Sequence, residues 1–401
     1  MANSPRPLAP PDLAPELKPI LEAPFPRFSA AEMTRRRNAI AAAMAAADVD
    51  HLVIYGANRT GNIIQWMTQW PVLTEAAGVH TPGQRDVLHI QHYNHIAQAR
   101  RLAEAQVEWG GASAIQGAIA ELERRGAARD RVGIIGPLGF RGHAALVQSF
   151  GAVKDLNPAY TRARMVKSDE EISWFRLGAY LSDLGIAALE REARPGLTER
   201  ELGAIIEAAW LPYGAVNVIH FLGVTPMETP DLCVPAQYPS SRRVAQGDVI
   251  TTEISGQFWD HSGQVLRSFA VGREPTPLYR DLHAAADAAF DAMFAAVRPG
   301  AKPADLIAAA RVIEEAGFTT NDDIVHGYGG GYFPPVLGSA SRPAAGPVPD
   351  FPLAPGMMMV IQPNVITRDN KAGVQTGELV LVTDKGAMRM HNFPRGFRRI
   401  G

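Results

Sequence analysis

The sequence has few cysteines, little net charge and no long apolar run, and each absence excludes a class of protein. Cys233 is the only cysteine among the 401 residues, which excludes an intrachain disulfide and a cysteine-rich zinc site. The 39 basic residues nearly balance the 41 acidic ones, which argues against a nucleic-acid partner. No stretch of about 18 uninterrupted apolar residues occurs, and the first residues lack the pattern of a signal peptide. We therefore expect a cytoplasmic protein that binds a small-molecule substrate, with no nucleic-acid or membrane partner.

Length and local patterns indicate two folded domains after a short arm. Residues 1–25 are rich in proline and alanine and are expected to form an extended arm. In residues 26–158, short apolar segments alternate with helical patterns, at 51–56, 86–91 and 131–136 for the strands and 94–106 and 112–125 for the helices. This alternation predicts a small α/β domain with a partly parallel sheet.

Residues 159–401 contain one pattern twice. The motif RPG occurs at 194 and again at 298, each time between the end of one predicted helix and a short loop that leads to a second. In the strand segments that follow, Glu253 and Gln362 each stand six residues after a glycine. The repetition predicts an internally duplicated domain with a pseudo-twofold axis, in which Glu253 and Gln362 face one cavity.

Several segments between residues 160 and 395 together resemble a known family. They are RMVKSDEEI, GDVITTEISG with LRSFAVG, VHGYGGGYFPP, PGMMMVIQPNV and GVQTGELVLVT. They resemble the pita-bread domain shared by creatinase, prolidase, aminopeptidase P and methionine aminopeptidase, and the residues before them resemble the creatinase-type N-terminal domain. The resemblance implies an α+β fold with a pita-bread domain over 159–401, a smaller α/β domain over 26–158, and a homodimer.

Metal-dependent members of this family hold two divalent ions with two aspartates, one histidine and two glutamates. The resemblance places these ligands at Glu253, Gln264, His326, Gln362 and Gly377, so only the histidine is retained. Two divalent ions need several anionic oxygens, which glutamine and glycine do not supply. The sequence therefore predicts a site without metal and without another cofactor.

The side chains that remain at these positions indicate acid–base chemistry at a C–N bond. His326 is expected to be the general acid or base, with Glu253 orienting its ring or raising its pKa. Gln264 and Gln362 each offer an acceptor and a donor to an amide, urea, guanidine or carboxylate group. The alternative readings are a histidine kept by the fold, and glutamines that bond to loop backbone.

Further residues are assigned to the substrate site with less specific signals. Tyr328 and Tyr332 flank a glycine-rich turn and are expected to donate to a developing oxyanion. Glu378 is included on the condition that its side chain turns inward. His220 lies where relatives line the substrate pocket, and a buried core histidine explains it equally well. Arg59 lies in a loop that reaches the neighbouring active site in creatinase-type dimers, although a surface arginine is the favoured reading.

The expected function is metal-independent hydrolysis or elimination at a C–N bond of a small amide-, amidine- or urea-like substrate. This expectation describes a creatinase-like hydrolase and ranks peptidase activity below it. One alternative is a metal-dependent Xaa-Pro dipeptidase that uses His326, Glu253 and Glu378. The other is a non-catalytic protein of the same fold that binds a metabolite. The position of creatinase's catalytic histidine falls at about Ala236 here, which argues against creatine itself as substrate.

Overall fold

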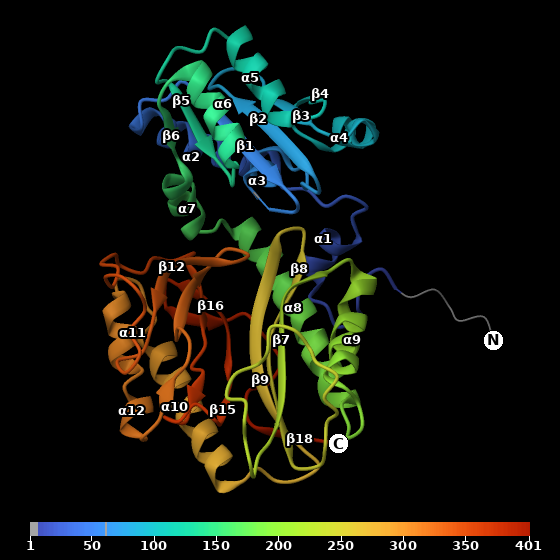
Figure 1. Cartoon of the computed structure of the whole chain (residues 1–401), viewed down its shortest axis with the longest axis vertical. Coiled ribbons are helices and arrows are strands. Elements are labelled where there is room, and N and C mark those ends of the chain that lie inside the picture. The colour runs from blue at the N-terminus through green and yellow to red at the C-terminus, as the bar shows by residue number, and fades with distance from the viewer. Residues whose placement is uncertain (1–6, 61) are drawn as a thin grey trace, which may run out of the picture. The chain divides into compact units, whose positions relative to one another are not determined.

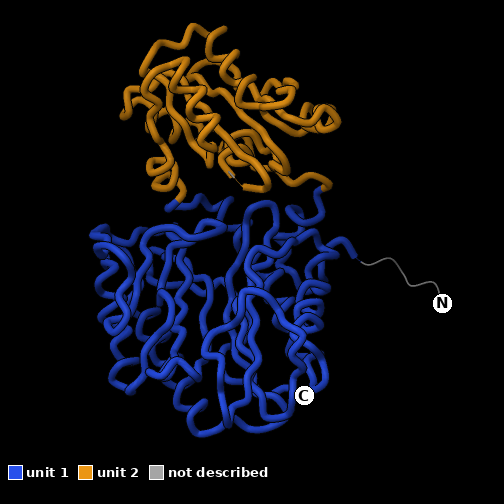
Figure 2. Tube along the Cα trace, viewed as in Figure 1, with its two compact units in different colours: residues 1–23, 165–401 blue, residues 24–164 orange. Residues whose placement is uncertain are grey.

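The computed structural model describes residues 7–60 and 62–401, which divide into two compact units (Figure 2). Unit 1 consists of residues 1–23 and 165–401, and unit 2 of residues 24–164. The expected division at 158/159 falls inside helix α7 (Asn157–Met165), and the observed boundary lies at the end of that helix. A hydrogen-bonded helix forms cooperatively, so it is not divided in its first turn.

The N-terminal arm differs from the expected extended segment. A 3-10 turn, η1 (Pro15–Leu17), leads into the short helix α1 (Lys18–Glu22), and Leu17 and Leu21 are buried. Both elements have a proline in their first two positions, where its missing N–H is no loss and its fixed φ suits a helix. Pro15 and Pro19, two of the prolines that suggested an extended arm, therefore stand in the first turns of helical elements.

A six-stranded sheet forms the centre of unit 2, in the order β4-β3-β2-β1-β5-β6 (Figure 1). Its strands are β1 (His51–Ala57), β2 (Glu75–His80), β3 (Val87–Ile90), β4 (Gln106–Trp109), β5 (Val132–Ile135) and β6 (Val153–Asp155). Strand β1 is parallel to β5 and antiparallel to β2, and β5 is parallel to β6. The expectation of a partly parallel sheet is confirmed.

Helices cover both faces of this sheet because successive strand residues point to opposite faces. Leu52 and Ile54 of β1 pack in one apolar cluster with residues of α2, α3 and α4, whereas Val53 packs in another with residues of α5 and α6. The helical elements, besides α7, are α2 (Ala30–Ala46), α3 (Ile63–Thr68), η2 (Tyr93–His95), α4 (Ile96–Leu102), α5 (Ala114–Arg124) and α6 (Phe140–Phe150). Unit 2 is thus a three-layer α/β domain.

The main sheet of unit 1 has nine strands. Its path is β12-β11-β13-β16-β9-β8-β7, with β17 paired to β16 and β18 paired to β9. The strands are β7 (Val216–Pro226), β8 (Asp248–Phe258), β9 (His261–Val271), β11 (Val325–Tyr328), β12 (Tyr332–Leu337), β13 (Met358–Ile361), β16 (Gly377–Thr383), β17 (Gly386–Arg389) and β18 (Arg398–Ile400). A small second sheet contains β10 (Thr319–Thr320), β14 (Val365–Ile366) and β15 (Gly373–Val374).

Two groups of helices precede the two halves of the main sheet along the chain, as the repeated sequence pattern indicated. The first group, before β7, is α8 (Asp169–Glu192), α9 (Glu199–Trp210) and η3 (Leu211–Tyr213). The second, before β11, is α10 (Pro277–Ala296), α11 (Pro303–Ala309) and α12 (Val312–Glu315). Ser168 and Glu171 form a capping box at the start of α8. Figure 1 shows both groups beside the strands of unit 1.

Helix α8 packs directly against the backbone of β9. A Cβ atom at Gly263 would lie 2.3 Å from the Cα atom of Ala179, closer than any real side chain comes. Only glycine allows this approach. The contact fixes the position of β9 against the helix, and with it the position of Gln264 on the opposite face of the strand.

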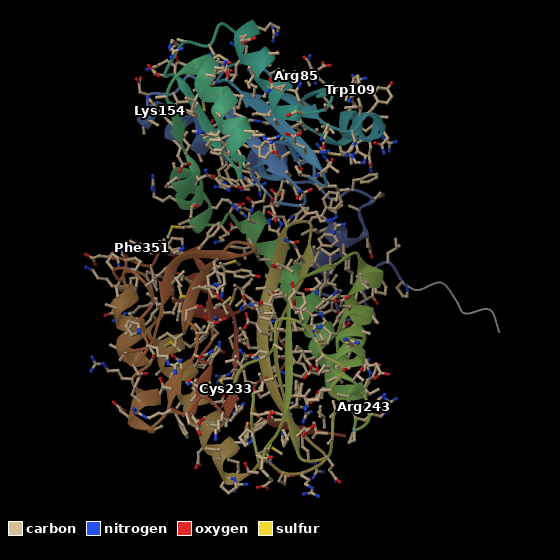
Figure 3. All side chains as sticks on the ribbon, in the orientation of Figure 1. Arg85, Trp109, Lys154, Cys233, Arg243 and Phe351 are labelled. Atoms are coloured by element: carbon tan, nitrogen blue, oxygen red, sulfur yellow. The ribbon has the colours of Figure 1, made fainter. Side chains whose placement is uncertain are left out.

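The single cysteine has the surroundings of a structural thiol. Cys233 lies in the segment that connects β7 to β8, and its side chain is buried (Figure 3). Burial raises the pKa of its thiol. A protonated thiol is a poor nucleophile. Cys233 is therefore assigned a structural role.

Candidate active site

Strand alternation brings four of the predicted residues to one face of the main sheet. Glu253 on β8 lies opposite Leu266, and Gln264 on β9 lies opposite Ser255. His326 on β11 lies opposite Val360 of β13, and Gln362 follows β13 directly. Paired residues of antiparallel strands share a face, as do residues two apart. Glu253, Gln264, His326 and Gln362 are all buried, with at most 4% of each exposed.

The Gln264 amide joins two of these side chains. Its Nε2 donates to Oε1 of Glu253 at 2.9 Å and to Oε1 of Gln362 at 2.8 Å. The Nε2 of Gln362 in turn donates to Oδ2 of Asp323 at 3.2 Å. The result is an amide bridge, defined here as Gln264 and Gln362, with a carboxyl group at each end.

Both carboxyl groups have pKa values shifted towards neutrality. Burial and the charge of Asp322 raise the pKa of Glu253 to about 7. Burial raises the pKa of Asp323 well above its ordinary value, and the charge of Asp322 raises it further. Asp323 was not found from the sequence. The only signal was an acidic pair immediately before the strand of His326.

The raised pKa of Glu253 predicts a pH-dependent stability. Folded Glu253 holds its proton up to about pH 7, whereas the unfolded chain releases it near pH 4.5. The folded state therefore loses about 3 kcal/mol of stability from this group as pH rises through that interval. Urea denaturation at pH 5 and pH 8 measures the loss. The variant Glu253→Gln lacks the titrating group and is expected to lose less stability between the two pH values; identical losses in the two proteins contradict the shift.

His326 differs from its predicted role. Its Nδ1 lies 3.1 Å from the carbonyl oxygen of Gly327, and burial lowers its pKa to about 4. We expected Glu253 to orient this ring or raise its pKa, and that prediction was wrong because Glu253 hydrogen bonds with amide groups while burial disfavours the imidazolium. At neutral pH, His326 is a neutral ring with Nδ1 as donor and Nε2 as acceptor.

The two tyrosines of the glycine-rich turn have different partners. The ring of Tyr332 stacks on that of His326, with centroids 3.9 Å apart and planes 14° apart, and its hydroxyl donates to Asp323 Oδ1 at 2.9 Å. The Tyr328 hydroxyl lies 2.6 Å from Oγ of Ser262 and is fully enclosed. The ring of Tyr332 therefore covers His326. The Tyr328 hydroxyl instead contacts Ser262 in the interior.

Glu378 lies away from the amide bridge. It pairs with Val265 across β16 and β9, so it faces the side of the sheet opposite to Gln264. Its carboxylate accepts from Arg267 Nη2 at 2.7 Å and from Arg389 Nη2 at 3.0 Å. Although burial opposes it, these guanidinium groups hold the pKa of Glu378 below its ordinary value. The inward turn that we considered is excluded by this pairing.

His220 is also not brought to this group. His220 pairs with Ile254 and so faces the side opposite to Glu253, where its Nδ1 lies 3.0 Å from Oε1 of Glu207. Arg59 belongs to unit 2, in a turn where it has a positive φ of 63°. At position 220 the structure has a buried histidine, and at position 59 it has an arginine in a turn.

Comparison with known proteins identifies the family to which this chain belongs. The model of metallopeptidase family M24 matches residues 174–384, which is more than half of the chain. The chain belongs to metallopeptidase family M24. It is 29% identical over 235 residues to a Mycobacterium bovis protein named "Probable dipeptidase PepE", a match that covers 58% of this chain and 60% of the relative. It is 24% identical over 238 residues to the Xaa-Pro dipeptidase of Pyrococcus furiosus, covering 59% of this chain and 66% of that protein.

The solved structures of M24 proteins support the same fold. The crystal structure of the dipeptidase PepE from Mycobacterium ulcerans has a TM-score of 0.76 and 22% identity, and the match covers 93% of this chain and 99% of that one. The expected α+β fold, with a pita-bread domain preceded by a smaller α/β domain, is confirmed. No helix in residues 7–60 and 62–401 is long and apolar enough to cross a membrane.

The M24 relatives overturn one expectation about activity. We ranked a creatinase-like hydrolase above a peptidase, because most metal ligands are replaced. The matched relatives are named dipeptidase and Xaa-Pro dipeptidase, so peptidase activity is the one indicated and the ranking was wrong.

The residues at the five M24 ligand positions do not fit a pair of divalent ions. Gln264 turns an N–H group, not an oxygen, towards both Glu253 and Gln362. Within the described part of the chain, no group of three or more His, Cys, Asp or Glu side chains could hold a metal ion. Divalent ions require several convergent oxygen ligands, usually anionic.

Gly377, at the fifth M24 ligand position, has no room for a side chain. A Cβ atom there would lie 2.6 Å from the carbonyl oxygen of Ile361 and 2.9 Å from the Cα atom of Gln362. The backbone of β13 and the residue after it occupy the space where a ligand side chain would begin.

Proposed function

We propose that the protein hydrolyses short peptides, in particular dipeptides, with Glu253 and Asp323 as the reacting groups. The observation that carries the proposal is the pair of buried carboxyls at the two ends of the amide bridge, both with pKa values shifted towards neutrality. Membership of family M24 and relatives named as dipeptidases support peptides as the substrate class. Since the sequence match spans 60% of the first relative, its activity is carried over here only as a proposal.

The proposed reaction adds water across the peptide C–N bond. Ionised Glu253 takes a proton from water as its oxygen attacks the carbonyl carbon. Protonated Asp323 gives a proton to the leaving amine nitrogen as the C–N bond breaks. The acyl carbon gains OH, the amine gains H, and one proton returns from Glu253 to Asp323 before the next turnover. Two carboxyls with different environments are an established arrangement for acid–base chemistry.

Hydrolysis of dipeptides after metal removal tests the proposal. We expect purified protein treated with EDTA and dialysed to release amino acids from a dipeptide panel that includes Xaa-Pro sequences. The rate is expected to rise through pH 7 as Glu253 ionises and to fall at higher pH as Asp323 loses its proton. Activity that disappears with EDTA and returns with added manganese contradicts the assignment of Glu253 and Asp323. Absence of hydrolysis across the panel contradicts the peptidase proposal itself.

A second candidate is binding of a short peptide without hydrolysis. The observation that favours it is that Glu253, Gln264 and Gln362 are hydrogen bonded to one another within a buried group. Saturable binding of a dipeptide that remains uncleaved after prolonged incubation distinguishes it from the peptidase.

A further inference from the structure

A cavity of about 380 Å³ lies in unit 2, whereas the reacting groups of the proposed function belong to unit 1. His80, the last residue of β2, lines this cavity and pairs with Leu52 of β1. Paired residues of antiparallel strands share a face, so His80 points to the side of the sheet on which Leu52 packs with residues of α2. The other lining residues used below are Arg37 and Asn38 of α2, Arg85 and Asp86 between β2 and β3, and Glu104 between α4 and β4.

His80 has one ring nitrogen without a hydrogen-bond partner. Its Nδ1 lies 2.6 Å from Oδ1 of Asp86. A carboxylate only accepts, so Nδ1 carries the hydrogen and, in the neutral ring, Nε2 has the lone pair. Only 7% of the side chain is exposed, and Nε2 has no partner among the described residues. Buried polar atoms are nearly always paired, so Nε2 requires a donor that these residues do not supply.

Asp86 provides a second acceptor next to the His80 ring. Its Oδ2 accepts no hydrogen bond within the described part of the chain, and its ion-pair partner, Nε of Arg37, is 3.6 Å away. Glu104 is already paired, because Oε2 accepts from Arg37 Nη2 at 3.1 Å and Oε1 accepts from Arg27 Nη2 at 3.3 Å. The unpaired acceptors of the cavity are therefore Nε2 of His80 and Oδ2 of Asp86, which we call the acceptor pair.

Arg85 provides an unpaired cation in the wall of the same cavity. It is exposed in the turn between β2 and β3 (Figure 3), and its guanidinium has no ion pair or hydrogen bond within residues 7–60 and 62–401. Two arginines and two acidic residues line the cavity, so their charges sum to zero. Because Arg37 and Glu104 are bonded to each other, the charges left for a ligand are those of Arg85 and Asp86.

We propose that this cavity binds a free amino acid, which is a small zwitterion. Its ammonium brings three N–H donors and one positive charge, which match the acceptor pair of His80 and Asp86. Its carboxylate accepts from the guanidinium of Arg85, whose planar fork fits two carboxylate oxygens. The inference goes beyond the proposed function and holds whether or not the protein is a peptidase.

A ligand that carries only one sign of charge fits these groups less well. An anion such as phosphate would meet the carboxylates of Asp86 and Glu104 and would leave Nε2 of His80 without a donor. A simple cation would leave Arg85 without a counter-charge. Within the described part of the chain, no group of three or more His, Cys, Asp or Glu side chains could hold a metal ion. The volume of about 380 Å³ is within the usual range of small-molecule sites.

Calorimetric titration of the intact protein at pH 7 with alanine, leucine, proline, phenylalanine and glutamate tests the inference, in a buffer without zwitterions or phosphate. We expect at least one of these amino acids to bind saturably, at one site per chain. The N-acetyl and the amide derivative of the tightest binder are titrated next. Each lacks one of the two charges and is expected to bind at least about tenfold more weakly. Sodium phosphate alone is titrated as a separate probe.

Matched variants assign the binding to this cavity. Arg85→Gln removes the unpaired cation and is expected to weaken binding at least about tenfold. Arg129→Gln is the control, since Arg129 is also an exposed arginine of unit 2 but does not line the cavity, and it is expected to keep the affinity. His80→Asn retains an N–H group for Asp86 but lacks Nε2, and it is expected to weaken binding as well. If this buried substitution prevents folding, the exposed position 85 still decides the test.

The outcomes separate this inference from the proposed function. Loss of amino-acid binding in Arg85→Gln with dipeptide hydrolysis retained supports a site distinct from the reacting groups. Amino-acid binding without any hydrolysis supports the inference and overturns only the peptidase proposal. The inference is overturned if none of the five amino acids binds, if both derivatives bind as tightly as the parent, or if Arg85→Gln keeps full affinity. Phosphate that binds in place of the amino acids overturns it too, because the cavity is then an anion site.

Discussion

Replacing Glu253 by glutamine is expected to lower kcat for dipeptide hydrolysis by about 10²- to 10⁴-fold, the usual contribution of a general base. Glutamine fills the same volume and keeps an oxygen for the Gln264 amide, but it cannot take a proton from water. Steady-state rates at pH 8 with one dipeptide measure kcat and KM.

The acid end of the amide bridge provides a paired comparison for this prediction. Asp323→Asn is expected to reduce kcat strongly, whereas Asp322→Asn is expected to retain turnover, because Asp322 is exposed and acts on the site through its charge and through the hydrogen bond that it accepts from the Asp323 backbone N–H. Removing that charge lowers the pKa of Glu253, so the rising limb of the pH profile is expected to move to lower pH. Equal losses in both variants contradict the separate roles of the two aspartates.

Replacing Glu378 by glutamine is expected to lower the free energy of unfolding by about 3–5 kcal/mol, the usual cost of breaking a buried ion pair. Arg267 and Glu378 are both almost completely buried, and the substitution leaves the Arg267 guanidinium without its counter-charge. Thermal and urea denaturation measure the loss.

Two further variants show whether an uncompensated charge is the cause. Removing both charges in Arg267→Met with Glu378→Leu is expected to restore part of the lost stability, since two apolar side chains leave no buried charge. Glu274→Gln, which breaks the exposed pair with Arg399, is expected to change stability little. A double variant less stable than Glu378→Gln contradicts this explanation.

Local sequence signals predicted the elements that position the site. The strand pair around Glu253 and Gln264 and the strand before Gln362 depend on neighbouring residues and on periodicity. The convergence of Glu253 and Gln362 was also predicted from the repeated pattern, and the structure joins them through Gln264.

Features that depend on tertiary contacts were not predicted. Asp323 reaches Gln362 across 39 residues, and nothing in its local sequence distinguishes it from Asp322. The pKa of His326 is set by burial, which the sequence does not reveal. The direction of Glu378 is a different case, because the twofold period of a strand already places it opposite to Gly377. Applying that period would have removed Glu378 from the predicted site.

The close approach at Gly377 limits how a metal centre could be rebuilt in this protein. Changing Gln264 and Gln362 to acidic ligands exchanges side chains on a backbone that stays where it is. A glutamate at position 377 instead requires β13 and β16 to separate, since the carbonyl oxygen of Ile361 lies 2.6 Å from where its Cβ would be. An engineer would therefore have to remodel the backbone first, and a screen of single substitutions would reject this position at every step.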